Sequence, residues 1–233
     1  MSTDTLGLRE QKKRETRQAI SDHATQLFLE RGFDRTTIAD IATAARVAKM
    51  TVTNYFPRKE DLALDHHEEF AAGLARTVAN RPAGESALGA VRRAYLAALE
   101  RRDPVIGFTG REFARMVAES PTLVARLRDL HDQREEGLAR QLAHEEPGDP
   151  VAARAVAAQL AAADRLLFRE LQARMLADDD PPGAGADAHA TDRGAHATAD
   201  AAVRDERIAA ELGEFARRVF DLLEPAIGGY AVR

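Results

Sequence analysis

The stretch Thr36–Leu62, TTIADIATAARVAKMTVTNYFPRKEDL, contains two short helical patterns joined by a tight turn. Thr36 or Thr37 can cap the first helix, and Asp40 completes a Thr-x-x-Asp variant of the capping box. The second pattern covers about 49–56 and is stopped by the proline that follows it. The buried stripe of the first helix is expected to be Ile38, Ile41, Ala42 and Ala45. Two short helices with this connection predict a helix-turn-helix, whose second helix enters the major groove of DNA.

The second helix has an outward face that would make a poor core. Val52 and Phe56 are four residues apart and share the face that points toward the first helix. The opposite face carries Lys49, Met50, Thr53 and Asn54. Lysine can donate to guanine, asparagine can pair with adenine, and the methyl groups of methionine and threonine can meet the thymine methyl. A generic three-helix corner with a solvated polar face is the alternative, and the spacing alone leaves it open.

Three residues flank this face and can reach DNA phosphates: Thr51, Tyr55 and Lys59. The charge distribution favours the same partner. The 233-residue chain has a formal net charge of −5, yet residues 1–60 hold 11 Lys and Arg against 8 Asp and Glu. That is +3 for the first sixty residues and −8 for the remainder. A basic N-terminal module on an acidic body is typical of a small DNA footprint attached to a larger partner-binding domain.

The composition excludes several other classes of protein. There is no cysteine, so neither a disulfide framework nor a thiolate metal site is possible. The first thirty residues lack the apolar run of a signal peptide, and no segment is apolar for the ~20 residues that a membrane span needs. We therefore expect a cytoplasmic protein without a membrane partner.

Almost every other segment also has a helical pattern, because Ala, Leu, Arg and Glu dominate and apolar residues recur at steps of three and four. A first helix is expected from about Leu8 to Arg31 and a longer one from about Lys59 to Asn80. Pairs of a small polar residue and proline mark three further helix starts, at Asp103–Pro104, Ser120–Pro121 and Asp149–Pro150.

Two features stand out near the C-terminus. Residues 178–200 contain no large apolar side chain, so we expect a flexible linker there. The last helix, at about 203–223, places apolar residues at alternating steps of four and three, which predicts a narrow seam like that of a coiled coil. The seam residues are Ile208, Leu212, Phe215, Val219 and Leu222.

The sequences GFDRTTIADIA at 32–42 and YFPRKEDL at 55–62 closely resemble the DNA-binding domain of the TetR family of bacterial transcriptional regulators. The resemblance covers about Arg9 to Leu64. It implies an all-α homodimer with a helix-turn-helix, three-helix DNA-binding domain at 1–58. A helical ligand-binding and dimerisation domain follows at 59–233 and includes the linker.

Carried over by position, a set of residues falls where members of that family touch DNA. These are Thr37, Lys49, Met50, Thr51, Thr53, Asn54, Tyr55 and Lys59. The basic lead LREQKKRETR at 8–17 resembles members whose N-terminal arm adds backbone contacts, with Lys12, Lys13 and Arg14 as candidates.

Two departures from the family pattern concern the turn. Family members usually have glycine where this chain has Arg46, and a positive φ at a non-glycine residue costs about 1–2 kcal/mol. Ala48 stands where a capping serine is common, and a lost cap costs about 1 kcal/mol. Either the domain is less rigid when free, or Arg46 adds a phosphate contact.

The resemblance also implies a ligand pocket within the helices from Lys59 to about His144. Candidate lining residues are Phe70, Tyr95, Phe108, Phe113 and Met116, although aromatic and methionine residues at helical spacing are often plain core. Dimerisation is expected through the last two long helices, because the seam and the Ala-rich face of Val151–Leu171 suit a four-helix interface. The alternative is that the seam packs only within one subunit.

The sequence thus predicts a ligand-responsive DNA-binding transcriptional regulator. The expected form is a repressor that binds a palindromic operator as a homodimer and is released by a small-molecule effector. A helical ligand-binding or protein-interaction module with a degenerate DNA-binding head is the alternative, and loss of salt-dependent DNA binding would favour it. An enzyme is disfavoured, because the chain lacks a Gly-rich phosphate loop, a cysteine and a His-x-x-x-His pair. No metal and no cofactor are expected.

Overall fold

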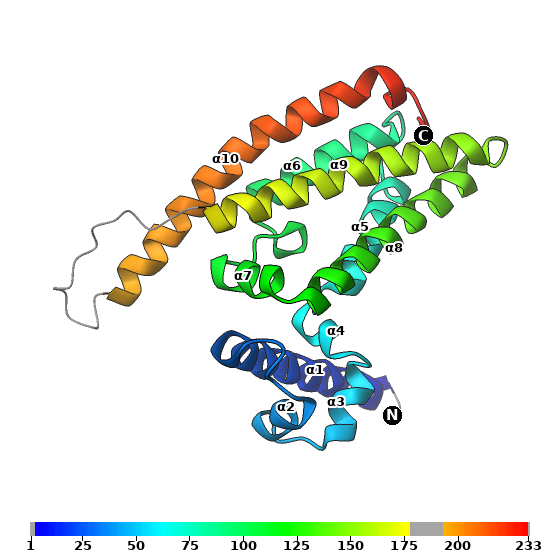
Figure 1. Cartoon of the computed structure of the whole chain (residues 1–233). Helices are drawn as coiled ribbons and strands as arrows, with labels where there is room; N and C mark the ends of the chain where they lie inside the picture. The colour runs from blue at the N-terminus through cyan, green and yellow to red at the C-terminus, as the bar shows by residue number, and fades with distance from the viewer. Residues whose placement is uncertain (1–2, 178–192, 233) are drawn as a thin grey trace. The chain divides into compact units, whose positions relative to one another are not determined.

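The computed structural model describes residues 3–177 and 193–232, and within these ranges the chain is helical without strands (Figure 1). The helices are α1 (Thr3–Arg31), α2 (Ile38–Ala44), α3 (Lys49–Tyr55), α4 (Lys59–Ala63), α5 (His67–Ala79), α6 (Ala87–Glu100), the 3-10 helix η1 (Pro104–Ile106), α7 (Arg111–Glu119), α8 (Pro121–Glu145), α9 (Pro150–Ala177) and α10 (Arg193–Ile227). The expected all-α class is confirmed. In the described part, no helix combines the length and the apolarity needed to span a bilayer.

The chain forms two compact units. The first unit comprises the chain up to Glu68 together with Arg115–Leu127, and the second comprises Glu69–Ala114 and Arg128–Arg233. The first unit therefore extends past the expected boundary at residue 58 and takes in a later segment as well. One consequence is that α8 contributes residues to both units.

The core of the first unit forms around one face of α1. Ile20, Ala24, Leu27 and Phe28 are buried there, as the sequence pattern predicts. The Phe28 ring lies 5.1 Å from the ring of Phe33, just after the helix. Ile41 and Ala42 of α2 are buried, whereas Ile38 and Ala45 are half-buried. The predicted buried stripe of α2 is thus confirmed at Ile41 and Ala42, whereas Ile38 and Ala45 are less buried than predicted.

The single helix predicted from about Lys59 to Asn80 is wrong, because the chain breaks between α4 and α5. Leu64 ends α4 with φ −107° and ψ 58°, outside the helical region. The carboxylate of Asp65 accepts a hydrogen bond from Ser21 Oγ at 2.8 Å. The His67 ring nitrogen Nδ1 lies 2.9 Å from the Leu64 carbonyl oxygen. These contacts satisfy polar groups at the break, and the Ser21 bond is a tertiary one that helical periodicity does not encode.

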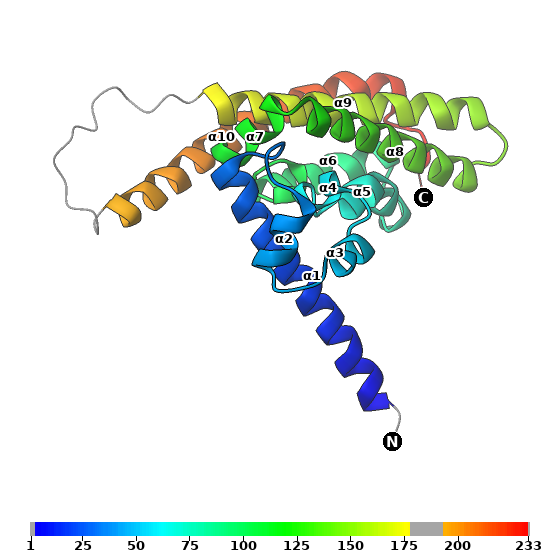
Figure 2. The ribbon, with the colours of Figure 1, turned by 60° about the horizontal axis from the view of Figure 1, so that its bottom comes forward.

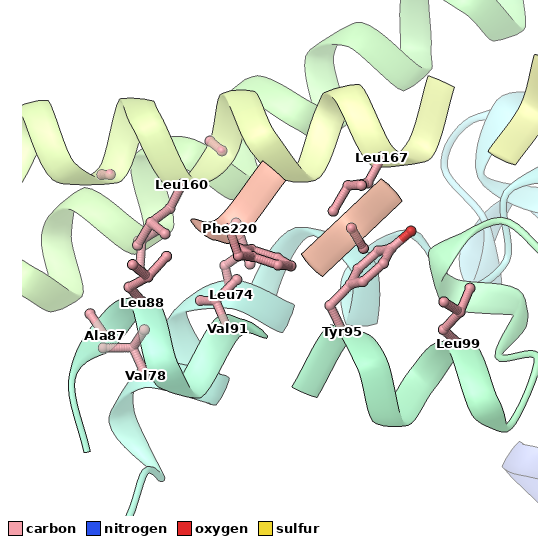
Figure 3. Close-up of a cluster of buried hydrophobic side chains, with 14 of the residues drawn as sticks. Leu74, Val78, Ala87, Leu88, Val91, Tyr95, Leu99, Leu160, Leu167 and Phe220 are labelled. Atoms are coloured by element: carbon pink, nitrogen blue, oxygen red, sulfur yellow. The ribbon is translucent and has the colours of Figure 1, made fainter. Parts of the chain in front are cut away.

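The second unit packs α6 against α9 and α10. Figure 3 shows Leu88, Val91 and Tyr95 of α6 facing Leu160 of α9 and Phe220 of α10. The Tyr95 ring lies 6.1 Å from the Phe220 ring at 61°, an edge-on contact. The starts predicted at Pro121 and Pro150 are confirmed, and Asp149 caps α9 by accepting from the Ala152 amide at 2.9 Å.

The buried stripe of α10 differs from the predicted seam. The buried residues follow at steps of four: Ile208, Leu212, Ala216 and Phe220. Of the predicted seam, Phe215 and Val219 are only half-buried and Leu222 is 80 % exposed. A stripe with steps of four curves around the helix, which suits α10 because it contacts both α6 and α9.

The linker predicted at 178–200 is wrong for its last eight residues, 193–200. Residues 178–192 lie outside the described part of the chain. Residues 193–200, RGAHATAD, belong to α10, which starts at Arg193 rather than near residue 203. Four of these eight residues are alanine or arginine, which are strong helix formers. The helix continues from them into its buried stripe.

Candidate nucleic-acid interface

A complete capping box fixes the start of α2. The Asp40 amide donates to Thr37 Oγ1 at 3.2 Å, and the Thr37 amide donates to Asp40 Oδ2 at 2.9 Å. The hydrogen bonds from the Thr37 side chain and amide lower the pKa of Asp40 below its usual value. Thr36 is buried instead, and its hydroxyl donates to the Gly32 carbonyl at 2.9 Å. Thr37 is therefore the cap of α2, and it is exposed at the helix N-terminus.

The turn between α2 and α3 is held in a left-handed conformation at Arg46. Its φ is +55°, as expected from the glycine that usually occupies this position. The Val47 amide donates to the Ala42 carbonyl at 3.0 Å, and the Arg46 amide donates to the Thr43 carbonyl at 3.2 Å. This pair of bonds is the Schellman motif, in which a residue with positive φ ends the helix. The Arg46 side chain is exposed.

The helix α3 begins without a side-chain cap. Ala48 occupies the N-cap position in extended conformation, and no side chain accepts from the first turn of the helix. Val52 is fully buried and Phe56 is 1 % exposed, so these two residues anchor α3 to the rest of the first unit. The predicted anchor pair is confirmed.

The predicted base-reading face of α3 points away from this core. Lys49, Met50 and Asn54 are exposed, with Met50 at 69 %. Thr53 is half-buried, and its hydroxyl donates to the Met50 carbonyl at 3.1 Å. The flanking residues Thr51 and Tyr55 are half-buried as well. The first unit therefore brings these residues together on seven residues of helix, next to Arg46.

Lys59 differs from the other candidates, because its ammonium group is engaged inside the first unit. The Nζ atom donates to the carbonyl oxygens of Phe33 at 3.0 Å and Thr36 at 3.2 Å. It also lies 4.1 Å from the centre of the Phe33 ring, a cation–π contact. Lys59 thus ties the start of α4 to the connection between α1 and α2.

The N-terminal half of α1 projects beyond α2 and α3 (Figure 2). From Gly7 to Ala19 its residues are exposed, apart from half-buried Thr16 and Arg17. The Arg17 guanidinium lies 4.5 Å from the Phe56 ring centre, at the end of α3. At 100° per residue, Arg17 shares a face with two other basic residues of α1, namely Arg9 and Lys13. We call these three residues the basic stripe of α1.

The helical phase extends the expectation for the arm. Of the three candidates, Lys13 belongs to the basic stripe, whereas Lys12 and Arg14 flank it on opposite sides, each about 60° from its nearest member. Arg9 and Arg17 complete the stripe. The signal was present in the sequence, because helical periodicity places Arg9, Lys13 and Arg17 four residues apart on one face.

A buried ion pair holds the later segment of the first unit to α4. Asp61 is 5 % exposed and accepts from Arg126 Nε at 2.9 Å and from Arg126 Nη2 at 2.8 Å. The His67 ring nitrogen Nε2 lies 4.0 Å from the same carboxylate. The sequence pattern predicted none of these roles, since Asp61 and Arg126 are 65 residues apart.

The five candidate ligand residues are distributed over both units, four in the second and one in the first. Phe70 is buried between His131 and Phe168, with edge-on ring contacts at 5.0 and 5.9 Å. Tyr95 and Phe108 are also buried in the second unit, where Phe113 is half-buried. Met116 belongs to the first unit. Tyr95 lines a groove of about 450 Å³ in the second unit.

Two buried groups of the second unit, His131 and Tyr95, have shifted pKa values. Burial lowers the pKa of His131 to about 4, and the nearby Arg165, Arg134 and Arg169 act in the same direction while Asp164 opposes them. Burial likewise raises the pKa of Tyr95, whose hydroxyl has no hydrogen-bond partner among the described residues. Where the structure describes side chains, no cluster of three or more His, Asp or Glu is arranged to hold a metal ion.

Comparisons with known proteins agree with this geometry. Residues 20–65 match the family described as bacterial regulatory proteins, tetR family. The chain is similar to the HTH-type transcriptional regulator TcmR of Streptomyces glaucescens, at 34 % identity over 172 residues, 70 % of this chain and 76 % of that protein. It is also similar to the HTH-type transcriptional repressor DhaR of a Mycobacterium species, at 38 % identity over 64 residues, 28 % of this chain and 32 % of DhaR.

Among solved structures, a TetR-family regulator from Streptomyces coelicolor is similar at 24 % identity. The match covers 88 % of this chain and 94 % of that chain, with a TM-score of 0.44. The sequence similarity to TcmR spans most of both proteins, and the family match covers the helix-turn-helix. The chain therefore belongs to the TetR family of bacterial regulatory proteins, which are non-enzymatic, DNA-binding transcriptional regulators.

Proposed function

We propose that this protein is a ligand-responsive repressor that binds a palindromic operator as a homodimer and leaves it when a small-molecule effector binds. The observation that carries the proposal is the α3 face, where Lys49, Met50 and Asn54 are exposed while Val52 and Phe56 are buried. A helix anchored on one side can present the other to base edges without losing its position in the first unit. The similarity over 64 residues to DhaR, a named repressor, supports the direction of regulation.

Each exposed side chain of α3 has a base for which its chemistry is suited. Lys49 can donate to guanine O6 or N7, and Asn54 can pair with the N6 and N7 atoms of adenine. Met50 and the Thr53 methyl group can contact the thymine methyl. The Thr53 hydroxyl already donates to the Met50 carbonyl, so we assign Thr53 an apolar rather than a donor role.

Phosphate contacts are proposed for the residues around this face. Thr37 lies at the N-terminus of α2, and Arg46, Thr51 and Tyr55 border α3. The basic stripe of α1 extends the positive surface, since Arg17 lies beside the end of α3. Such contacts fix the register of the protein on DNA and make its affinity depend on salt. Lys59 contributes by holding the first unit together, because its ammonium group is bound to main-chain carbonyls.

A homodimer through α9 and α10 is supported by the apolar surface that they leave uncovered. Val151, Ala155, Ala162 and Leu166 of α9 are all exposed and fall within about 60° of one another around the helix. On α10, Leu222 is exposed beside half-buried Phe215 and Val219. Apolar helix faces of this kind are buried in a four-helix dimer interface. A dimer presents two α3 helices to the two halves of a palindrome.

Release by an effector requires that the effector binds the DNA-free conformation more tightly than the DNA-bound one. The helix α8 offers a route for such coupling, because it is continuous and contributes residues to both units. Within the first unit, Arg126 of α8 holds Asp61 of α4 through two short contacts. A shift of α8 would therefore act on α4 directly.

A degenerate DNA-binding head is the second candidate function. The observations that favour it are the missing cap at Ala48 and the left-handed conformation of Arg46, each of which reduces the stability of the reading helix. Under this alternative the second unit would bind a ligand or a protein without DNA.

Selection of binding sites from a random-sequence DNA pool at physiological salt separates the two. The repressor proposal expects an enriched inverted repeat with half-sites about one helical turn apart. The double variant Lys49→Ala with Tyr55→Ala should lose binding to that repeat, while size-exclusion chromatography still shows a dimer. Arg140→Gln is the matched control, because it removes an exposed positive charge from the second unit. No enrichment by a folded dimer, or normal binding by the double variant, would refute the assignment.

A further inference from the structure

The groove in the second unit lies between α5 and α6. Its volume is about 450 Å³, within the range of small-molecule sites. Polar residues of α5 and the residue just after it line one side: Glu69, Arg76, Thr77 and Asn80. The lining from α6 and η1 is largely apolar and includes Val91, Ala94, Ala98, Val105 and Ile106. A molecule that fills the groove must therefore have an apolar body and a polar edge.

A buried arginine, Arg134, also lines this groove. Arg134 is 7 % exposed, and its guanidinium binds the Asp164 carboxylate through Nε at 2.9 Å and Nη2 at 3.0 Å. Its Nη1 donates to the Phe70 carbonyl oxygen. A guanidinium has five N–H donors, and these bonds use three. Arg134 thus retains donor capacity within the lining of the groove.

A glycine leaves room for this guanidinium. A Cβ atom at Gly73 would lie 2.6 Å from Arg134 Nη1, closer than side-chain carbons approach. Gly73 lines the groove as well. The absence of a side chain at this position is therefore what allows Arg134 to approach α5 where the groove lies.

The other arginines of the groove differ in how far their charge is already neutralised. Arg93 forms two bonds of 2.8 Å with the Glu85 carboxylate, and Arg101 lies 3.3 Å from Asp103 Oδ2. Arg76 instead donates to the main-chain carbonyl oxygen of Glu69 at 3.1 Å, which uses one of its five donors. The side chain of Arg76 is exposed, one turn beyond Gly73 on α5.

We infer that this groove binds a small apolar molecule that carries an anionic oxygen group, with the anion paired with Arg76 and hydrogen-bonded by a spare N–H group of Arg134, and with the apolar body against α6. The lining offers more donors than acceptors, so the ligand must supply acceptors. Anionic acceptors gain most, because charge-assisted hydrogen bonds are about twice as strong as neutral ones. The inference names the chemical class of the effector and rests on the proposed function for that role.

A matched pair of fluorescent probes tests the anion requirement. 1-Anilinonaphthalene-8-sulfonate carries an apolar body and an anionic group, and N-phenyl-1-naphthylamine has the same body without the sulfonate. Both are titrated into the full-length protein without DNA. The variants are Arg76→Gln, which removes the exposed charge, and Gly73→Ala, which crowds Arg134. Arg154→Gln is the control, because Arg154 lines a separate hollow of about 560 Å³ between α8 and α9.

The expected result is a sulfonate affinity about tenfold weaker in Arg76→Gln, with the neutral probe changed less than about twofold. Gly73→Ala should also weaken the sulfonate, and Arg154→Gln should leave both affinities unchanged. Equal sulfonate binding by Arg76→Gln and the wild type would overturn the inference, as would a parallel loss of both probes or a loss in Arg154→Gln. Because DNA is absent, failure here leaves operator binding untouched, and failure of operator binding leaves this result standing.

Discussion

Replacing Arg46 by glycine should stabilise the helix-turn-helix and weaken its binding to DNA. Arg46 holds φ +55° in the Schellman turn, which costs a non-glycine residue about 1–2 kcal/mol. Glycine avoids that cost but loses about 0.5–1 kcal/mol of chain entropy on folding. The net gain for Arg46→Gly is therefore about 0.5–1 kcal/mol in the local free energy of unfolding.

The same substitution removes one positive side chain next to the reading helix in each subunit. If each Arg46 contacts a phosphate, the dimer loses two contacts. The slope of log affinity against log salt then becomes shallower by about 2. Stability and DNA affinity thus move in opposite directions.

Hydrogen exchange of the α2 and α3 amides measures the first effect, and exchange should slow about two- to fivefold. Fluorescence anisotropy over a salt series measures the second. Arg46→Gln is the control, because it removes the charge and keeps the strained conformation, so it should weaken DNA binding without slowing exchange. Ala48→Ser should restore a cap and add about 1 kcal/mol without changing the salt slope. Faster exchange in Arg46→Gly, or an unchanged slope, would refute this reasoning.

Three further predictions concern buried polar groups of the second unit. Tyr95→Phe removes a buried hydroxyl that has no partner in the described part of the chain, so it should raise the melting temperature by about 2–4 °C in calorimetry. A lower melting temperature would mean that the hydroxyl is satisfied. Asp164→Asn leaves the buried Arg134 guanidinium without its counter-ion and should destabilise the protein by about 3–5 kcal/mol in urea unfolding; a loss below 1 kcal/mol would contradict a buried pair. His131 has a folded-state pKa of about 4, against an ordinary 6.5. Between pH 4 and pH 6.5 the imidazole is therefore protonated in the unfolded chain and neutral in the folded one, so the free energy of unfolding falls as the pH drops through that window. Wild type should lose about 3 kcal/mol more than His131→Gln between pH 7 and pH 4, and equal losses would show that His131 does not titrate differently on folding.

Much of the first unit could be predicted because its signals are local. The capping box of Thr37 and Asp40 lies within four residues, and the anchor pair of Val52 and Phe56 is one helical turn apart. The positive φ of Arg46 follows from the tight turn and from the family resemblance. The engagement of Lys59 could not be predicted in this way, because its acceptors at Phe33 and Thr36 are more than twenty residues away.

The second unit was less predictable because its helices offer more than one apolar face. On α10, both the predicted seam and the observed stripe contain Ile208 and Leu212. They diverge afterwards, where Ala216 replaces Phe215 as the buried residue. Only packing against α6 and α9 decides between them. The candidate ligand residues stay a prediction for a related reason, since an aromatic side chain such as Phe70 has the same sequence pattern whether it fills a core or lines a groove.

The exposed half of α1 has a thermodynamic consequence for DNA binding. An isolated helix of this length is marginal in water, because its first turn is costly to nucleate. Here the buried half, from Ile20 onward, already supplies the nucleus, so the N-terminal half needs only to propagate. The contacts that stabilise the N-terminal half are local ones, such as the hydrogen bond from the Gln11 side chain to the Glu15 carboxylate at 2.9 Å. The point at which the helix frays should therefore shift with temperature, and phosphates along the basic stripe should move it toward the N-terminus. Helix content would then rise when the operator is added, and the enthalpy of binding would include the heat of forming those turns.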